Sequence, residues 1–63
     1  MLFGFKQGSK TVKQLRKEKS LTIKELAAIS GLSVSVLSKV DNRKIKLVPQ
    51  PIKSNIKNAL SNI

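Results

Sequence analysis

The sequence has 63 residues, of which 13 are Lys or Arg and three are Asp or Glu, so its formal net charge is +10. A chain of this length forms one small domain that buries only about 60% of the surface of its unfolded form, so we expect helix packing or self-association to stabilise it. The absence of Cys excludes disulfides and thiolate metal sites. With three carboxylates and no His, we expect no enzymatic activity, no cofactor and no metal site.

The positive charge is spread over both halves of the chain, so the sequence has no separate basic tail. A field of one sign attracts polyanions, namely nucleic acid, an acidic protein face or an anionic membrane. Solubility alone is the alternative explanation, but a surface kept soluble by charge normally mixes both signs. No apolar stretch approaches the length of a membrane span, and residues 1–5 are too short for a secretory signal, so we expect a cytoplasmic protein.

The first eight residues differ from the rest of the chain. We expect residues 1–8 to form an N-terminal arm and residues 9–63 to form a single domain. Phe3 and Phe5 alternate as in a short strand, so the arm packs on the domain, pairs with a second subunit or stays frayed.

The first helix is expected to be capped by Ser9 and to end near Lys19, with Val12 and Leu15 facing inward. Ser20 and the residue after it form a short break.

A capping box indicates where the second helix begins. Thr22 and Glu25 have the spacing at which each side chain satisfies a free backbone donor near the other, which predicts a helix over residues 23–29. Gly31 ends this helix because glycine tolerates the positive φ of a tight turn. The inward-facing residues are expected to be Ile23, Leu26 and Ala27.

The third helix is expected to be capped by Ser33 and to cover residues 34–42, with Leu37 and Val40 on one buried face.

A basic connector over residues 43–46 then leads into an extended run that ends at Pro49 and Pro51, because proline interrupts a regular helix. A last helix from Ile52 carries an apolar stripe, made of Ile52, Ile56, Ala59, Leu60 and Ile63. We expect Ile52 and Ile56 to close the core, whereas Leu60 and Ile63 extend into a two-fold interface or also join the core. The elements together predict an all-α fold, a compact bundle of four to five short helices.

The segment from Thr22 to Asn42 predicts a helix, a tight turn and a second helix. Ala27 supplies the small residue that two steeply crossing helices need at their contact, and Gly31 supplies the turn. Leu32 follows as a core residue. The stretch TIKELAAISGLSVSVLSKVDN resembles the helix-turn-helix of the Cro and C1 phage-repressor family, also called the XRE family, with a lambda-repressor-like fold. The resemblance covers roughly residues 11–60; the alternative is a helical hairpin in some other bundle.

The resemblance implies that the helix starting at Ser33 enters the major groove of double-stranded DNA. The matching base-contacting positions are Ser33, Val34, Ser35, Ser38 and Lys39. Lys39 suits guanine O6 and N7, and Val34 suits a thymine methyl group. The hydroxyl of Ser33 is also needed as a cap, so its two roles compete. Few long polar side chains lie on this helix, so we expect modest direct readout, with affinity coming mainly from the DNA backbone.

The resemblance also implies phosphate contacts from the start of the second helix and from the segment after the third. The matching positions are Thr22, Lys24, Asn42, Arg43, Lys44 and Lys46. It further implies a semi-buried salt bridge between Arg16 and Asp41, strained or water-mediated because aspartate is shorter than the glutamate often found there.

Two positions depart from the family pattern. Ile23 replaces a glutamine that often contacts a phosphate, and Arg43 replaces a common helix-ending glycine, which leaves Asn42 as the expected left-handed cap. The chain ends about one helix after the motif, so we expect regulation through concentration, dimerisation or a partner.

The leading interpretation is a sequence-selective DNA-binding transcriptional regulator, a repressor, acting as a homodimer whose reading helices lie about 34 Å apart. The alternative is an antitoxin-like protein-interaction module of the same fold, in which the apolar arm with Leu2, Phe3 and Phe5 binds a protein partner. A cationic membrane-active peptide is the weakest interpretation, because the helices are short and Trp and Tyr are absent.

Overall fold

The structure is a computed structural model that describes residues 9–62. These residues form α1 (Val12–Glu18), α2 (Ile23–Ser30), α3 (Val34–Val40), the 3-10 helix η2 (Ile45–Leu47) and α4 (Ile52–Ser61). Within residues 9–62 the only β pairing is an isolated antiparallel bridge between Thr11 and Lys44. The prediction of an all-α bundle is therefore confirmed. The expected arm over residues 1–8 lies outside the described residues.

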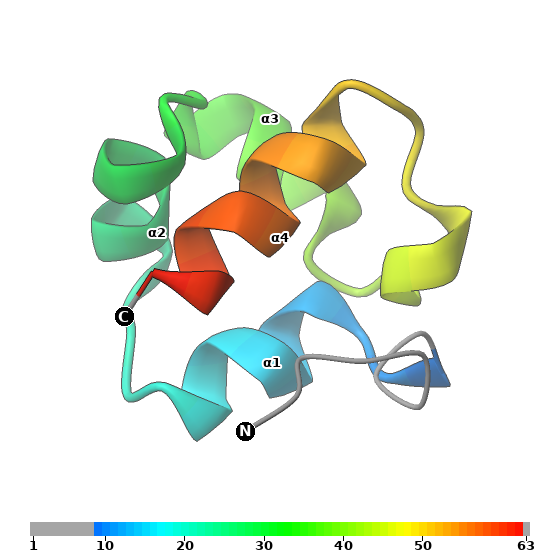
Figure 1. Cartoon of the computed structure of the whole chain (residues 1–63), viewed down its shortest axis with the longest axis horizontal. Helices are drawn as coiled ribbons and strands as arrows, with labels where there is room; N and C mark the ends of the chain where they lie inside the picture. Colours follow the sequence, from blue (N-terminus) through cyan, green and yellow to red (C-terminus); the bar gives the residue numbers. More distant parts are fainter. Residues whose placement is uncertain (1–8, 63) are drawn as a thin grey trace.

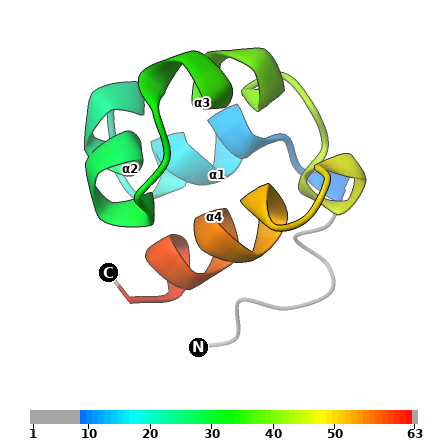
Figure 2. The same ribbon diagram turned by 90° about the horizontal axis from the view of Figure 1, so that it is seen from above.

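The four α-helices surround one apolar core. In Figure 1, α4 crosses the middle of the view, with α3 above it and α1 below it. Seen from above, α2 lies at one end of the bundle, and α3 and α4 lie on opposite sides (Figure 2). α2 packs against both α3 and α4. Across residues 9–62, no helix combines the length and the apolar character that crossing a bilayer requires.

α1 begins two residues later than the sequence predicted. Its N-cap is Thr11 and not Ser9: the Thr11 hydroxyl accepts from the Gln14 amide at 3.1 Å, and the Gln14 side chain accepts from the Thr11 amide at 2.8 Å. A box that starts at Thr11 has glutamine at its third helical position, which returns the hydrogen bond. A box that starts at Ser9 would have Val12 there, which has no acceptor. Val12 and Leu15 are buried, as predicted.

α2 begins and ends with the residues that the sequence indicated. Thr22 and Glu25 form the predicted capping box, with hydrogen bonds of 2.8 and 3.1 Å. Gly31 follows Ser30 with a φ of 74°, in the left-handed region, and turns the chain toward α3. The helix is one residue longer than predicted. The residues that it turns toward the core are Leu26 and Ala27, which are buried, and Ile23, which is partly buried.

α3 starts as predicted but ends early. The Ser33 hydroxyl accepts from the Val36 amide at 3.0 Å, and the helix ends at Val40 instead of Asn42. The expectation that Asn42 takes a left-handed conformation is wrong, because only Ser20 and Gly31 have positive φ within residues 9–62.

The turn after α3 is held by the start of α1 and not by a left-handed cap. The Lys13 amide donates to the Asp41 carbonyl oxygen at 2.8 Å, and the Val12 amide donates to that of Arg43 at 3.0 Å. The unpaired donors at the start of one helix thus meet the unpaired acceptors after another.

The connector between α3 and α4 is not simply extended, as the sequence had predicted. η2 turns the chain so that Ile45 and Val48, spaced three apart, both enter the core with exposures of 0% and 2%. A 3-10 turn brings residues at this spacing onto one side. Burying these two side chains explains why the segment leaves the extended conformation.

α4 completes the core. Ile56, Ala59 and Leu60 are buried, and Ile52 packs partly buried against them. Leu60 is 0% exposed in the single chain. Of the two alternatives for Leu60, the core is therefore confirmed and the two-fold interface excluded, because its whole side chain already packs in the core. Ile63 lies outside the described residues.

Candidate nucleic-acid interface

The outer face of α3 carries all five side chains that the sequence assigned to base contacts. Its inner face is fixed in the core by Leu37 and Val40. The five side chains expected to contact bases are all exposed, and they are Ser33, Val34, Ser35, Ser38 and Lys39. Val34 is 40% exposed although it is apolar, so it is available to an apolar group of a partner. By helical spacing Val34, Ser35, Ser38 and Lys39 lie on the side of α3 opposite its buried residues, and Ser33 caps the start of the helix; we call these five residues the reading face.

The Ser33 hydroxyl can cap α3 and contact a base at the same time, so its two expected roles need not compete. In the cap, its oxygen accepts one hydrogen bond, from the Val36 amide. A hydroxyl has two acceptor lone pairs and one donor proton, so a second lone pair and the proton remain. Because Ser33 is exposed, these groups are open to an external partner.

The predicted capping box limits the backbone donors that the N-terminus of α2 can offer to a phosphate. The capping box occupies the amides of Thr22 and Glu25, which leaves those of Ile23 and Lys24 without a side-chain cap. The Glu25 carboxylate also lies at this end and offsets part of the positive helix dipole. The Thr22 and Lys24 side chains are nevertheless exposed.

A basic segment after α3 carries the other expected phosphate contacts. Asn42, Arg43, Lys44 and Lys46 are all exposed, so each is available to solvent or to a polyanion. We call residues 42–46 the basic segment.

The backbone of the basic segment is tied to the start of α1. Two main-chain hydrogen bonds hold the segment itself, from the Val12 amide to the Arg43 carbonyl oxygen at 3.0 Å and from the Ile45 amide to that of Lys10 at 2.8 Å. A third, from the Lys13 amide to the Asp41 carbonyl oxygen at 2.8 Å, holds the residue just before it. We call these three bonds, with the Thr11–Lys44 bridge, the main-chain clamp. It could not be expected from the sequence, because pairing between residues about 30 positions apart leaves no local pattern. The one local signal is the capping-box spacing of Thr11 and Gln14.

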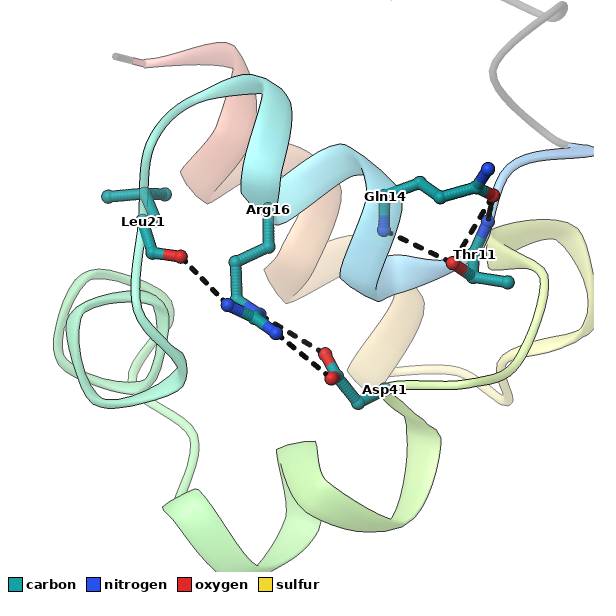
Figure 3. Close-up of polar contacts among 5 residues, drawn as sticks. All are labelled: Thr11, Gln14, Arg16, Leu21 and Asp41. Carbon is teal, nitrogen blue, oxygen red and sulfur yellow. Dashed lines mark hydrogen bonds and ion pairs between the residues drawn. The ribbon is translucent and has the colours of Figure 1, made fainter.

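The Arg16–Asp41 pair is present and is direct. The Arg16 Nε and Nη2 atoms donate to the two Asp41 carboxylate oxygens at 3.2 and 3.1 Å, and Nη1 donates to the Leu21 carbonyl oxygen at 2.9 Å (Figure 3). The side chains are only 12% and 13% exposed. The expected strain or bridging water is therefore not needed, because the guanidinium reaches both oxygens itself. One side chain of α1 thus holds the end of α3 and the loop before α2.

All three carboxylates of the chain have a local partner. Glu18 pairs with Lys10, Glu25 closes the capping box of α2, and Asp41 binds Arg16. Within residues 9–62, Lys10 and Arg16 are the only cations in an ion pair. The other basic side chains of these residues make no ion pair, and neither the reading face nor the basic segment includes an acidic residue.

Two short helices joined at a left-handed glycine, the second with its outer face free and followed by exposed cations, define a helix-turn-helix domain. The comparison with protein families agrees. A family model described as helix-turn-helix matches residues 12–42, from the first residue of α1 to the turn after α3. This segment is a helix-turn-helix of the Cro and C1 type, the XRE family, a DNA-binding class. Neither the curated proteins nor the solved structures gave a match.

Proposed function

We propose that the chain binds double-stranded DNA with a preference for sequence, and that it represses transcription by occupying its site. The observation that carries this proposal is the reading face. Its five side chains, on α3 and its N-cap, are exposed, and the apolar side of the same helix is packed in the core. The helix-turn-helix match over residues 12–42 supports the same function.

The side chains of the reading face suit contact with bases in the major groove. Serine hydroxyls donate to or accept from several bases, Lys39 suits guanine O6 and N7, and the exposed Val34 suits the methyl group of thymine. Hydroxyl groups discriminate less than bidentate arginine or glutamine. We therefore propose modest direct readout, helped by sequence-dependent deformation of the duplex.

The basic segment and the start of α2 are proposed to bind phosphates on either side of the reading face. Lys24, Arg43, Lys44 and Lys46 supply four exposed positive charges, and Thr22 and Asn42 add neutral polar groups. Phosphate contacts fix the register of a protein on DNA and supply most of its nonspecific affinity.

We propose a homodimer on DNA, because a seven-residue reading helix spans only a few base pairs. Since Leu60 is buried, the interface would use other apolar groups. The large apolar side chains exposed within residues 9–62 are Ile29, Val34 and Leu47, and Val34 belongs to the reading face. The alternative role as an antitoxin-like module with a protein partner rested on the arm, which lies outside the described residues.

Selection of bound duplexes from a random pool tests this proposal, because it reports binding, preference and footprint together. We expect an enriched motif, with two half-sites centred about one helical turn apart if the protein binds as a dimer. Recovery of unenriched sequence would contradict the sequence preference. Absence of any retained duplex at low salt would contradict DNA binding itself.

A further inference from the structure

The position of the basic segment depends on α1, although no side chain of α1 belongs to the proposed base or phosphate contacts. In the main-chain clamp, the amides of Val12 and Lys13 donate to carbonyl groups at 3.0 and 2.8 Å, and the Ile45 amide donates back to Lys10 at 2.8 Å. Two of these three donors belong to the first turn of α1. The backbone that carries Asn42 to Lys44 is therefore anchored in part by that turn, alongside the buried Ile45 that follows it.

The first turn of α1 is itself stabilised by the exposed side chain of Gln14. The Gln14 side-chain oxygen accepts from the Thr11 amide at 2.8 Å, and the Thr11 hydroxyl accepts from the Gln14 amide at 3.1 Å (Figure 3). Helix starts fray when their first amides lack such partners. Because Val12 and Lys13 lie between the two residues of this box, the box fixes the direction in which their amides donate.

We propose that Gln14 is a positioning residue for the phosphate contacts of the basic segment. It acts through the first turn of α1 and the main-chain clamp, and its own side chain makes its hydrogen bonds with Thr11 and not with residues 42–46. This inference rests on the proposed function of the basic segment. The competing explanation is that α1 helps DNA binding only through its positive charge.

Two substitutions of Gln14 separate these explanations. Gln14→Ala removes the box and leaves the charge unchanged. Gln14→Glu keeps the box, since glutamate serves at this position as well as glutamine, but it removes one unit of net positive charge. A role in positioning predicts that the alanine variant binds DNA worse than the glutamate variant, whereas a role of charge alone predicts the reverse order.

Gln50→Ala is the matched control. The Gln50 side-chain oxygen accepts from the Ser54 amide at 3.1 Å near the start of α4, so its loss also removes a helix-start hydrogen bond, but outside the clamp. Thr11→Val is a milder second variant. It removes the two hydrogen bonds of the Thr11 hydroxyl and keeps the one from the Thr11 amide to Gln14, and it serves if Gln14→Ala does not fold.

The first measurement is amide hydrogen exchange without DNA, at a temperature at which circular dichroism shows each variant folded. We expect Gln14→Ala to speed exchange of the Ile45 amide at least about fivefold. The Leu37 amide, which donates to Ser33 within α3, should keep its rate. Gln14→Glu and Gln50→Ala should leave Ile45 protected. An Ile45 rate that is equal in Gln14→Ala and in the unsubstituted protein would overturn the inference.

The second measurement is the dissociation constant for a duplex as a function of salt. A loosened basic segment neutralises fewer phosphates, so in Gln14→Ala the slope of log K against log salt should fall by about 0.9 for each phosphate that is no longer bound. The slope should stay unchanged in Gln14→Glu. Fast exchange at Ile45 with an unchanged slope would overturn the positioning role. If the unsubstituted protein binds no duplex, the proposed function fails and this inference fails with it. That result is seen with the unsubstituted protein alone, before any variant is measured.

Discussion

Each of the three acidic side chains binds a particular partner within the fold. Asp41 shows this most clearly, because its carboxylate receives two hydrogen bonds from Arg16 while its main-chain carbonyl receives one from Lys13. The same guanidinium also binds the Leu21 carbonyl oxygen. The pair thus connects α1, the loop before α2 and the end of α3.

Asp41→Ala is expected to destabilise the domain strongly. It leaves the 12%-exposed Arg16 side chain without its counterion, and breaking such a pair costs about 3–5 kcal/mol. Urea unfolding followed by circular dichroism at low temperature measures the loss. The double variant Arg16→Met, Asp41→Leu is the control, since replacing both partners by apolar groups should recover at least about half of the loss. A single variant as stable as the original protein would show that the pair contributes little.

Lys39 is expected to contribute to selectivity more than to general affinity. Lys39→Ala should weaken binding to the preferred duplex by about 1–3 kcal/mol and relax the preference at one base pair. Lys57→Ala, on the exposed side of α4, is the matched control and should bind almost unchanged. Fluorescence anisotropy with the preferred duplex and its single-base variants reports both effects. If Lys39→Ala weakens all duplexes equally, Lys39 contacts a phosphate instead of a base.

At the level of elements, local pattern in the sequence indicated the starts of α2 and α3 correctly. Thr22 with Glu25 gives one such pattern, and the turn at Gly31 and the buried pair Leu37 and Val40 also follow from local pattern. The start of α1 was misplaced because a serine alone is weaker evidence than a threonine followed by a glutamine at the right spacing.

The features that the sequence could not predict depend on contacts between distant residues. η2 forms because Ile45 and Val48 pack in the core, and the turn after α3 is held by donors from α1. In both cases the contacting residues come from distant parts of the sequence, so they leave no periodic signal. The stripe on α4 was visible, but its division between core and surface depended on how the other helices pack, and Leu60 proved to be fully buried.

The turn between α2 and α3 should be sensitive to backbone strain alone. A side chain at Gly31 would meet nothing within 4 Å, but its φ of 74° is unfavourable for other residues. We expect Gly31→Ala to cost about 1–2 kcal/mol, which lowers the melting temperature of a domain this small by roughly 4–8 °C per kcal/mol.

Ser20→Gly is the control for this strain. Ser20 is a non-glycine residue with a φ of 57°, so glycine should leave the melting temperature unchanged or raise it. Thermal unfolding by calorimetry compares the two variants. A Gly31→Ala variant that melts at the original temperature would show that the turn relaxes without strain.

On the scale of the whole molecule, the main feature is a positive field with no acidic face to oppose it, because the three carboxylates are paired locally. We therefore expect steep dependence of DNA affinity on salt. Four cations near the reading face predict a slope of about −4 for log K against log salt per protomer, and about twice that for a dimer. Anisotropy titrations at several salt concentrations between roughly 50 and 300 mM measure this slope. Affinity that ignores salt would contradict phosphate binding.

The central claim is that the outer face of α3 meets DNA. Titration of the isotope-labelled protein with a selected duplex, followed by amide chemical shifts, tests it most directly. We expect the largest shifts at residues 33–39 and 42–46, smaller shifts at the start of α2, and almost none along the outer side of α4. Shifts that concentrate on α4 and leave residues 33–39 unchanged would contradict the claim.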